Sequence, residues 1–234
     1  MSVIAERHAT VALLMPAAGE GRRLGLDVPK ALAEIAGRPM VCRALEAFAS
    51  LAGLVEVVVL VPEMARQTFV SALSAARGDG VVPRVVGGGV TRQESVRLGL
   101  EALQSSPAIV CVHDAARPLA TPVIVSAVVT AAASSGAATA AARPVDSLRQ
   151  DDGHGDTRAI DRSSLWLVQT PQAFSLPLLL DAHRRAKRGG VSATDDASLV
   201  ERLCHARVAV VPNDAPNLKV TTAADLACAR ALCR

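Results

Sequence analysis

The sequence is poor in aromatic residues, with no tyrosine, one tryptophan and three phenylalanines, or 2% of 234 residues. Hydrophobic residues still make up 50% of the chain, which excludes global disorder and allows a sizeable core. That core must therefore be built mainly from Val, Leu, Ile and Ala. This composition favours closely packed helices on a valine-rich sheet.

A large excess of one charge is also missing, since 25 basic and 22 acidic residues leave a net charge of +3. This balance argues against a protein that coats nucleic acid, so we expect no nucleic-acid partner and only a local basic site. No uninterrupted apolar run reaches the roughly 18–20 residues that a membrane helix needs. We therefore expect no membrane partner.

The five cysteines show no C-x-x-C pair, so neither a disulfide framework nor a zinc cluster is indicated. Near the N-terminus, Glu6, Arg7 and His8 precede the first strand-like run, which is the wrong order for a secretory signal. Together these features predict a cytoplasmic protein.

Short apolar runs bounded by Gly, Pro or charge recur along the chain and predict buried strands. They are Val11 to Met15, Val55 to Val61, Val81 to Val86, Ala108 to Val112 and Val208 to Val211. Helical spacing appears between several of them, at 41–49 and 96–103. This alternation predicts a single α/β domain over residues 1–234, a Rossmann-like, mostly parallel sheet with helices on both faces.

The stretch 143–164 breaks the alternation. It is polar and rich in turn residues, with Asp-Asp-Gly-His-Gly-Asp at 151–156 and strand-like pieces on either side. This pattern predicts a projecting β-hairpin arm. A disordered surface loop is the alternative.

In an open α/β sheet, ligands bind beyond the carboxyl ends of the strands, so the segments 16–30, 87–95 and 113–118 are candidate sites. In the first, Gly19 and Gly21 let the backbone turn sharply and bring its N–H groups close to an anion. Arg23 and Lys30 lie where they could meet a polyphosphate. Neither a P-loop nor a dinucleotide fingerprint fits, because Ala31 follows the lysine and Leu24 replaces a required glycine.

A strand followed by Ala-Ala-Gly-x-Gly-x-Arg at 17–23 and then Pro-Lys at 29–30 resembles the signature of nucleotidyltransferases that activate sugars and polyols. Further runs are similar to the 2-C-methyl-D-erythritol 4-phosphate cytidylyltransferases of the non-mevalonate isoprenoid pathway. These are Gly87-Gly88-Gly89 with Arg92 and Ser95, His113-Asp114-Ala115-Ala116-Arg117-Pro118, Gln169-Thr170-Pro171-Gln172, Thr194-Asp195-Asp196-Ala197-Ser198 and Asn217-Leu218-Lys219-Val220-Thr221.

The resemblance implies transfer of CMP from CTP to the polyol phosphate, with release of pyrophosphate. It assigns catalytic phosphate contacts to Arg23, Lys30 and Lys219. Asp114 suits Mg²⁺, which commonly takes one or two protein carboxylates beside a triphosphate. The substrate-binding positions that the resemblance implies are Pro16, Ala17, Ala18, Gly19, Gly21, Gly89, Arg92, Ser95, Asp114, Ala115, Arg117 and Thr170.

The resemblance also implies a homodimer through the arm, in which Ser147 and the catalytic Arg162 reach the polyol phosphate of the partner chain. The chain departs from the family pattern at Val90 and Pro216, where polar or acidic residues are common, and at Ser147, which replaces a threonine. A D-ribitol 5-phosphate cytidylyltransferase and a non-catalytic nucleotide-binding protein are the alternative functions.

Two motifs have simpler interpretations. We interpret His113 as a hydrogen-bonded structural imidazole, because a phosphate monoester nucleophile is already ionised at neutral pH and needs no base. Asp195 and Asp196 are interpreted as helix caps, because acidic side chains are common at helix starts.

Overall fold

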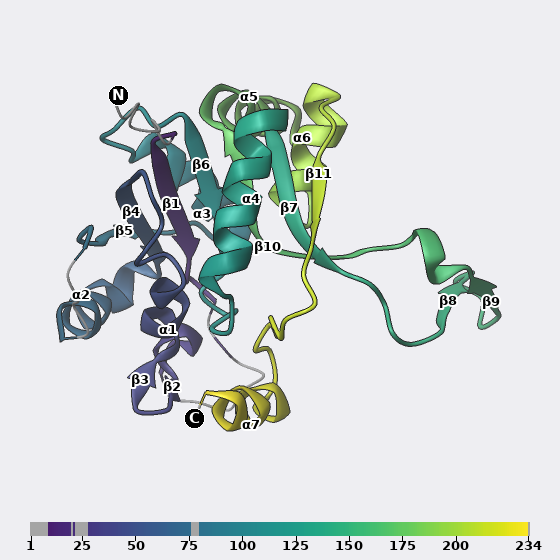
Figure 1. The fold of residues 1–234 in the computed structure, drawn as a ribbon, viewed down its shortest axis with the longest axis horizontal. Coiled ribbons are helices and arrows are strands. Elements are labelled where there is room, and N and C mark those ends of the chain that lie inside the picture. The colour runs from purple at the N-terminus through teal and green to yellow at the C-terminus, as the bar shows by residue number, and fades with distance from the viewer. Residues whose placement is uncertain (1–8, 20, 22–27, 76–79, 234) are drawn as a thin grey trace, which may run out of the picture.

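The structure, a computed structural model, describes residues 9–19, 21, 28–75 and 80–233. A seven-stranded sheet runs through the centre in the order β11-β7-β10-β6-β1-β4-β5 (Figure 1). Every neighbouring pair is parallel except for the two pairs formed by β10, which runs antiparallel to both β6 and β7. The strands of this sheet are β1 Val11–Pro16, β4 Leu54–Val61, β5 Arg84–Gly87, β6 Ile109–Val112, β7 Ala137–Ala142, β10 Leu167–Ser175 and β11 Ala209–Pro212.

Helices cover both faces of the sheet because its strands are apolar on both sides. In β1, Leu13 and Met15 join the core beneath α1, α2 and α4, whereas Leu14 joins the core beneath α3, α5 and α6. The α-helices are α1 Met40–Glu46, α2 Arg66–Ala75, α3 Arg92–Glu101, α4 Pro122–Ser135, α5 Leu176–Gly189, α6 Asp196–Cys204 and α7 Ala223–Leu232. This arrangement confirms the predicted α/β fold class.

Most of the predicted elements are present, with shifted bounds in some cases. Four of the five apolar runs coincide with strands β1, β4, β6 and β11, and the helical spacing at 41–49 and 96–103 corresponds to α1 and α3. The prediction of a strand from Val81 was wrong by three residues, since β5 begins at Arg84. Strands β7 and β10 had not been predicted.

The predicted arm is a β-hairpin that projects from the body of the molecule (Figure 1). Its strands β8 Leu148–Asp151 and β9 Thr157–Ile160 pair antiparallel, and a 3-10 turn, η4 Arg162–Ser164, follows them. At its base, Nη1 of Arg143 donates to the carbonyls of Ser163 at 2.9 Å and Leu165 at 3.0 Å. The Arg143 guanidinium also lies 3.6 Å above the ring of Trp166. These contacts join the two chain segments that lead to the hairpin.

A small third cluster closes the carboxyl edge of the sheet. The hairpin β2 Glu34–Ile35 with β3 Arg38–Pro39 packs near α7, with Ile35, Leu226 and Ala229 buried between them. Val220 belongs to the same cluster, and its N–H donates to the carbonyl of Ala116 at 2.8 Å. The 3-10 turns η2 Lys30–Leu32 and η3 Glu63–Ala65 complete the described elements. The cluster therefore holds the segment that carries Lys219 against the end of β6.

None of the helices in the described ranges is long and apolar enough to cross a membrane.

Candidate active site

A pocket of about 180 Å³ opens at the carboxyl ends of the parallel strands β1, β5 and β6. The loops that follow these strands form most of its wall, so the structure brings together the three segments that the sequence indicated. The residues that line it are Pro16, Ala17, Ala18, Gly19, Lys30, Ala31, Gly89, Val90, Thr91, Arg92, Ser95, Asp114, Ala115, Ala116 and Lys219.

Two described glycines of the first loop, Gly19 and Gly21, lie close to Lys30. Gly21 has a φ of +70°, and a Cβ added there would lie 2.9 Å from Cβ of Lys30, so both the backbone conformation and the space require glycine. A Cβ on Gly19 would lie 3.6 Å from Cε of Lys30. Nζ of Lys30 donates to the carbonyl of Val220 at 3.1 Å. Lys30 therefore joins this loop to the C-terminal segment. Arg23, the other cation predicted here, lies outside the described residues.

The second loop, 87–91, is braced by the first turn of α3. Thr91 caps the helix by accepting from the N–H of Glu94 at 3.0 Å. The buried hydroxyl of Ser95 accepts from the N–H of Gly89 at 3.0 Å and donates to the carbonyl of Thr91 at 2.9 Å. Ser95 thus fixes the shape of the loop, while the side chain of Val90 is 98% exposed at the rim.

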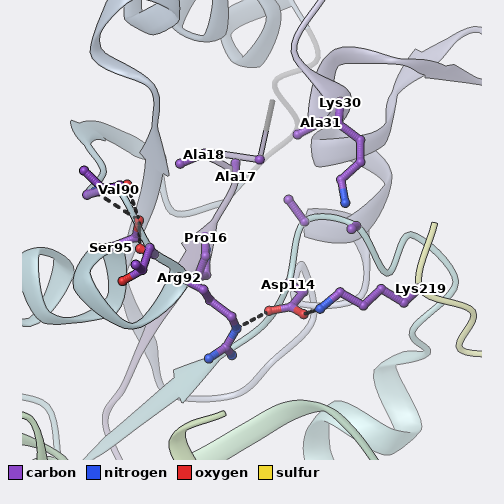
Figure 2. Close-up of a pocket in the computed structure, with 15 residues that line it drawn as sticks. Pro16, Ala17, Ala18, Lys30, Ala31, Val90, Arg92, Ser95, Asp114 and Lys219 are labelled. Atoms are coloured by element: carbon purple, nitrogen blue, oxygen red, sulfur yellow. Dashed lines mark hydrogen bonds and ion pairs between the residues drawn. The ribbon is translucent and has the colours of Figure 1, made fainter. Parts of the chain in front are cut away.

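Asp114 lies between two cations at the pocket wall (Figure 2). Its Oδ1 accepts from Nε of Arg92 at 2.8 Å, and its Oδ2 pairs with Nζ of Lys219 at 2.7 Å. Burial alone would raise the pKa of Asp114, but the charges and hydrogen bonds of Arg92 and Lys219 outweigh burial and hold that pKa below its usual range. The carboxylate is therefore ionised at neutral pH.

His113 is a structural residue, which confirms the interpretation from sequence. The ring is fully buried, with Nδ1 3.2 Å from Oγ1 of Thr170 and Nε2 3.1 Å from the carbonyl of Arg117. Burial lowers the pKa of His113 to about 4, so the imidazole is neutral at physiological pH. The histidine joins the loop after β6 to strand β10.

Arg117 and Thr170 hydrogen-bond to the chain segments that form the pocket wall. Oγ1 of Thr170 accepts from the N–H of Asp114 at 3.1 Å, and Nη1 of Arg117 donates to the carbonyl of Asn217 at 2.7 Å. Asn217 in turn donates through Nδ2 to the carbonyl of Thr170 at 2.8 Å. This amide had no signal of its own in the sequence beyond its place in the Asn-Leu-Lys-Val-Thr run.

Ser147 and Arg162 lie on the arm and do not line the pocket of their own chain. In Figure 1 the arm extends away from the carboxyl edge of β1 and β6. Arg162 hydrogen-bonds to the carbonyl of Val145 through Nη1. Within one chain, the structure therefore separates these two residues from the rest of the predicted site.

The two adjacent aspartates at the start of α6 have different roles. Asp195 is the N-cap and accepts from the N–H of Ser198 at 2.8 Å, as predicted. The prediction was wrong for Asp196, whose buried carboxylate pairs with Arg92 at 2.7 Å and His183 at 2.9 Å. Successive residues at a helix start point in different directions, so only one of the two can cap. No sequence signal had indicated His183.

The charged side chains on the described wall are the cations Lys30, Arg92 and Lys219 and the single carboxylate Asp114. This excess of positive charge in a concave site favours an anionic ligand. A mostly parallel α/β sheet with such a pocket beside glycine-rich loops at its carboxyl edge is typical of an α/β protein that binds a nucleotide or another phosphate-bearing ligand.

Comparison with known proteins identifies the family. The family model described as "IspD: 2-C-methyl-D-erythritol 4-phosphate cytidylyltransferase" matches residues 11–234, and the chain belongs to this family. The chain is similar to the enzyme of that name from Deinococcus radiodurans, with 44% identity over 221 residues that cover 94% of this chain and 88% of the relative. The corresponding enzyme from Shouchella clausii is 39% identical over 215 residues, which cover 92% and 93% of the two chains.

A solved structure agrees with this assignment. The crystal structure of 2-C-methyl-D-erythritol 4-phosphate cytidylyltransferase from Thermus thermophilus superposes with a TM-score of 0.79 at 37% identity. The match covers 96% of this chain and 99% of that one. The similarity therefore extends over the whole fold.

Proposed function

We propose that the protein transfers CMP from CTP to 2-C-methyl-D-erythritol 4-phosphate, giving 4-diphosphocytidyl-2-C-methyl-D-erythritol and pyrophosphate. Membership of the family supports this activity. The structural observation that carries it is the cationic pocket at the carboxyl edge of the sheet, where Lys30 and Lys219 converge beside two glycine-rich loops. Because CTP is a cytoplasmic nucleotide, we propose that the reaction takes place in the cytoplasm.

In the proposed reaction, an oxygen of the polyol phosphate attacks the α-phosphorus of CTP in line. A new P–O bond forms as the bond to the β-phosphate oxygen breaks, and pyrophosphate leaves with that electron pair. The nucleophile is already ionised, so the protein mainly supplies positioning and neutralises the charge that develops. We assign this neutralisation to Lys30, Arg23 and Lys219.

Magnesium is the divalent cation that we expect, and Asp114 fits it. Its carboxylate is ionised, and each oxygen accepts from one cation, which leaves a lone pair on each oxygen for a metal ion. Mg²⁺ usually combines one or two carboxylates with waters and phosphate oxygens. In the part of the chain that the structure describes, no group of three or more His, Cys, Asp or Glu side chains could hold a metal. When bound, the ion would neutralise charge on the triphosphate.

We further propose a homodimer in which the arm of each chain completes the site of the other. Within one chain, Ser147 and Arg162 on the arm are separated from Lys30 and Asp114 in the pocket. In the proposed dimer, the arm of one chain would bring Ser147 and Arg162 to the pocket of the other. The base of the arm exposes apolar side chains, with Val145 82%, Leu167 50% and Val168 44% exposed. Apolar residues in such positions favour burial against a partner.

A substrate panel tests the proposal. Pyrophosphate release is measured with each nucleoside triphosphate crossed with 2-C-methyl-D-erythritol 4-phosphate, D-ribitol 5-phosphate and other sugar phosphates, with Mg²⁺ present and with EDTA. We expect turnover with CTP, 2-C-methyl-D-erythritol 4-phosphate and Mg²⁺. Preference for D-ribitol 5-phosphate would select the alternative cytidylyltransferase, and CTP binding without turnover would indicate a non-catalytic protein. Full activity in EDTA would refute the metal requirement.

A further inference from the structure

The carboxylate of Asp196 is buried behind the pocket and has two charged or polar partners. The exposed fraction of this residue is 1%; Oδ2 accepts from Nη1 of Arg92 at 2.7 Å and Oδ1 lies 2.9 Å from Nε2 of His183. Burial would raise the pKa of Asp196, but Arg92 and His183 outweigh burial and lower it. An ionised carboxylate only accepts hydrogen bonds, so Nε2 of His183 carries a proton.

Arg92 connects this buried carboxylate to the pocket. Its Nε donates to Oδ1 of Asp114 at 2.8 Å while its Nη1 donates to Asp196. The guanidinium is planar, so fixing one edge sets the direction of the other. In Figure 2 the guanidinium and Lys219 hold Asp114 from opposite sides. A continuous chain of contacts therefore runs from His183 on α5 through Asp196, Arg92 and Asp114 to the ammonium of Lys219.

The start of α6 is anchored independently of Arg92. Gln172, on the buried strand β10, donates through Nε2 to Oδ2 of Asp195 at 3.0 Å and accepts from the N–H of Ala197 at 3.1 Å. The residues on both sides of Asp196 are thus tied to the sheet. Because its backbone is fixed in this way, Asp196 sets the position of Arg92, whose longer side chain has more rotatable bonds.

A buried ion pair contributes little net stability, because desolvation opposes the attraction between the charges. Well-packed apolar residues could fill the same volume at similar or lower free energy. Here the pair extends to a carboxylate and a lysine that line the pocket. This connection favours a role in placing charges at the site over a role in stability alone.

We propose that Asp196, supported by His183, is a positioning residue for the transfer reaction. It holds Arg92 so that Asp114 keeps the ammonium of Lys219 directed toward the phosphates. The proposal rests on the function proposed above, because it needs a phosphate for Lys219 to contact.

The first test is Asp196→Asn in the full-length protein, which preserves the shape of the side chain and removes its charge. We expect kcat with CTP and 2-C-methyl-D-erythritol 4-phosphate to fall by about 10- to 100-fold, because small misplacements of catalytic groups have effects of this size. The KM for CTP should change less than kcat, because the hydrogen bonds that shape the loop 87–91 are made to Glu94 and Ser95 on α3 and do not involve Asp196.

Glu56→Gln is the matched control. Glu56 is 7% exposed and pairs with Arg84 at 2.7 Å, yet it lies near the start of β4, at the edge of the sheet opposite the pocket. Both variants should lower the melting temperature, but only Asp196→Asn should lower kcat. If Asp196→Asn is folded and its kcat equals that of Glu56→Gln, the role is merely structural and the proposal is overturned.

A pair of variants at His183 keeps the proposal testable if Asp196→Asn does not fold. Gln at this position retains an N–H that can donate to Asp196, whereas Leu fills a similar volume with no donor. We expect His183→Gln to keep most of the kcat that His183→Leu loses. Equal kcat values in two folded variants would refute the support from His183.

A spectroscopic measurement distinguishes failure of this positioning role from failure of the proposed transfer activity. The chain has only three lysines, Lys30, Lys187 and Lys219, so ¹³C-dimethylated lysines give few NMR signals, and Lys219→Arg assigns one of them. We expect the Lys219 signal to shift in Asp196→Asn and to stay unchanged in Glu56→Gln. An unshifted signal refutes the proposal even if the enzyme is active. An inactive wild-type enzyme whose Lys219 signal shifts in Asp196→Asn refutes the function and supports the contact chain.

Discussion

Nζ of Lys30 donates a hydrogen bond to the main-chain carbonyl of Val220, which lies 190 residues further along the chain. The contact joins the first loop of the pocket to the segment next to Lys219. Two cations from opposite ends of the sequence are thereby held at one wall, where they can act on the same polyphosphate.

Replacing Lys30 by alanine should slow the chemical step by at least about 10² to 10³, which is the typical effect of removing one preorganised donor to a developing charge. Arg23→Ala should have a loss in the same range. Single-turnover formation of the cytidylyl product measures this step, and circular dichroism verifies folding. A loss of tenfold or less in both folded variants would contradict the assigned roles.

Arg162→Ala should raise the KM for the polyol phosphate and leave CTP binding almost unchanged, because Arg162 lies on the arm and outside the CTP pocket. Arg158→Ala is the control, since Arg158 is on the same hairpin and pairs with Gln150 across it. Steady-state kinetics with each substrate varied in turn distinguishes the two. Equal weakening of both substrates by Arg162→Ala would reject a site shared between chains.

Gly88→Ala should weaken CTP binding about tenfold, or by ~1.4 kcal/mol, because the added Cβ overpacks two loops of the pocket. That atom would lie 3.0 Å from Oγ of Ser95 and 3.1 Å from Cβ of Ala18. Gly80→Ala should have no effect on CTP binding, since an added Cβ there meets no described atom within 4 Å. Isothermal titration calorimetry measures both affinities, and an unchanged affinity for Gly88→Ala would show that the loops can separate without cost.

Glu56 should make stability depend on acid pH. Burial opposes ionisation, but hydrogen bonds from Ser105, Arg84 and the N–H of Gln104 prevail and lower the pKa of Glu56 from 4.5 to about 2. Because the pKa is lower in the folded state, the stabilisation is complete above pH 4.5 and is lost as the pH falls toward 2. Glu56→Gln should therefore be about 1–3 kcal/mol less stable at neutral pH, with a difference that shrinks in acid.

Urea unfolding at a series of pH values measures this difference. Glu101→Gln is the control, because Glu101 is largely exposed in its pair with Arg97 and such surface pairs contribute little. A constant difference between Glu56→Gln and the wild type from about pH 7 to about pH 3 would be inconsistent with the lowered pKa.

The sequence could predict the parallel strands and the loops because each carries its signal locally. The apolar run of β1 and the glycines after it lie within a few residues of one another, and the order of strands and helices then places the loops at one edge. Strand β7 could not be recognised, because Ala-Ala-Thr-Ala-Ala-Ala at 137–142 favours a helix by intrinsic propensity. Its pairing between β10 and β11 overrides that preference. Pro171 similarly obscured β10, since proline is unusual inside a strand.

The contacts behind the pocket were beyond prediction for a different reason. Arg92 and Asp196 are 104 residues apart, and His183 is an isolated histidine on an amphipathic helix. Nothing in the spacing of these residues indicates that they meet. Their contact is created by the packing of α3, α5 and α6 on one face of the sheet, so it becomes visible only in three dimensions.

Because β10 runs antiparallel to its neighbours, it connects the base of the arm directly to the residues behind the pocket. The strand leaves the base of the arm at Leu167, enters the middle of the sheet, and within the same run of backbone places Thr170 beneath the amide of Asp114. A displacement of the arm would therefore reach the backbone of Asp114 through only a few residues of β10, across the irregular register between Val168 and Gln172.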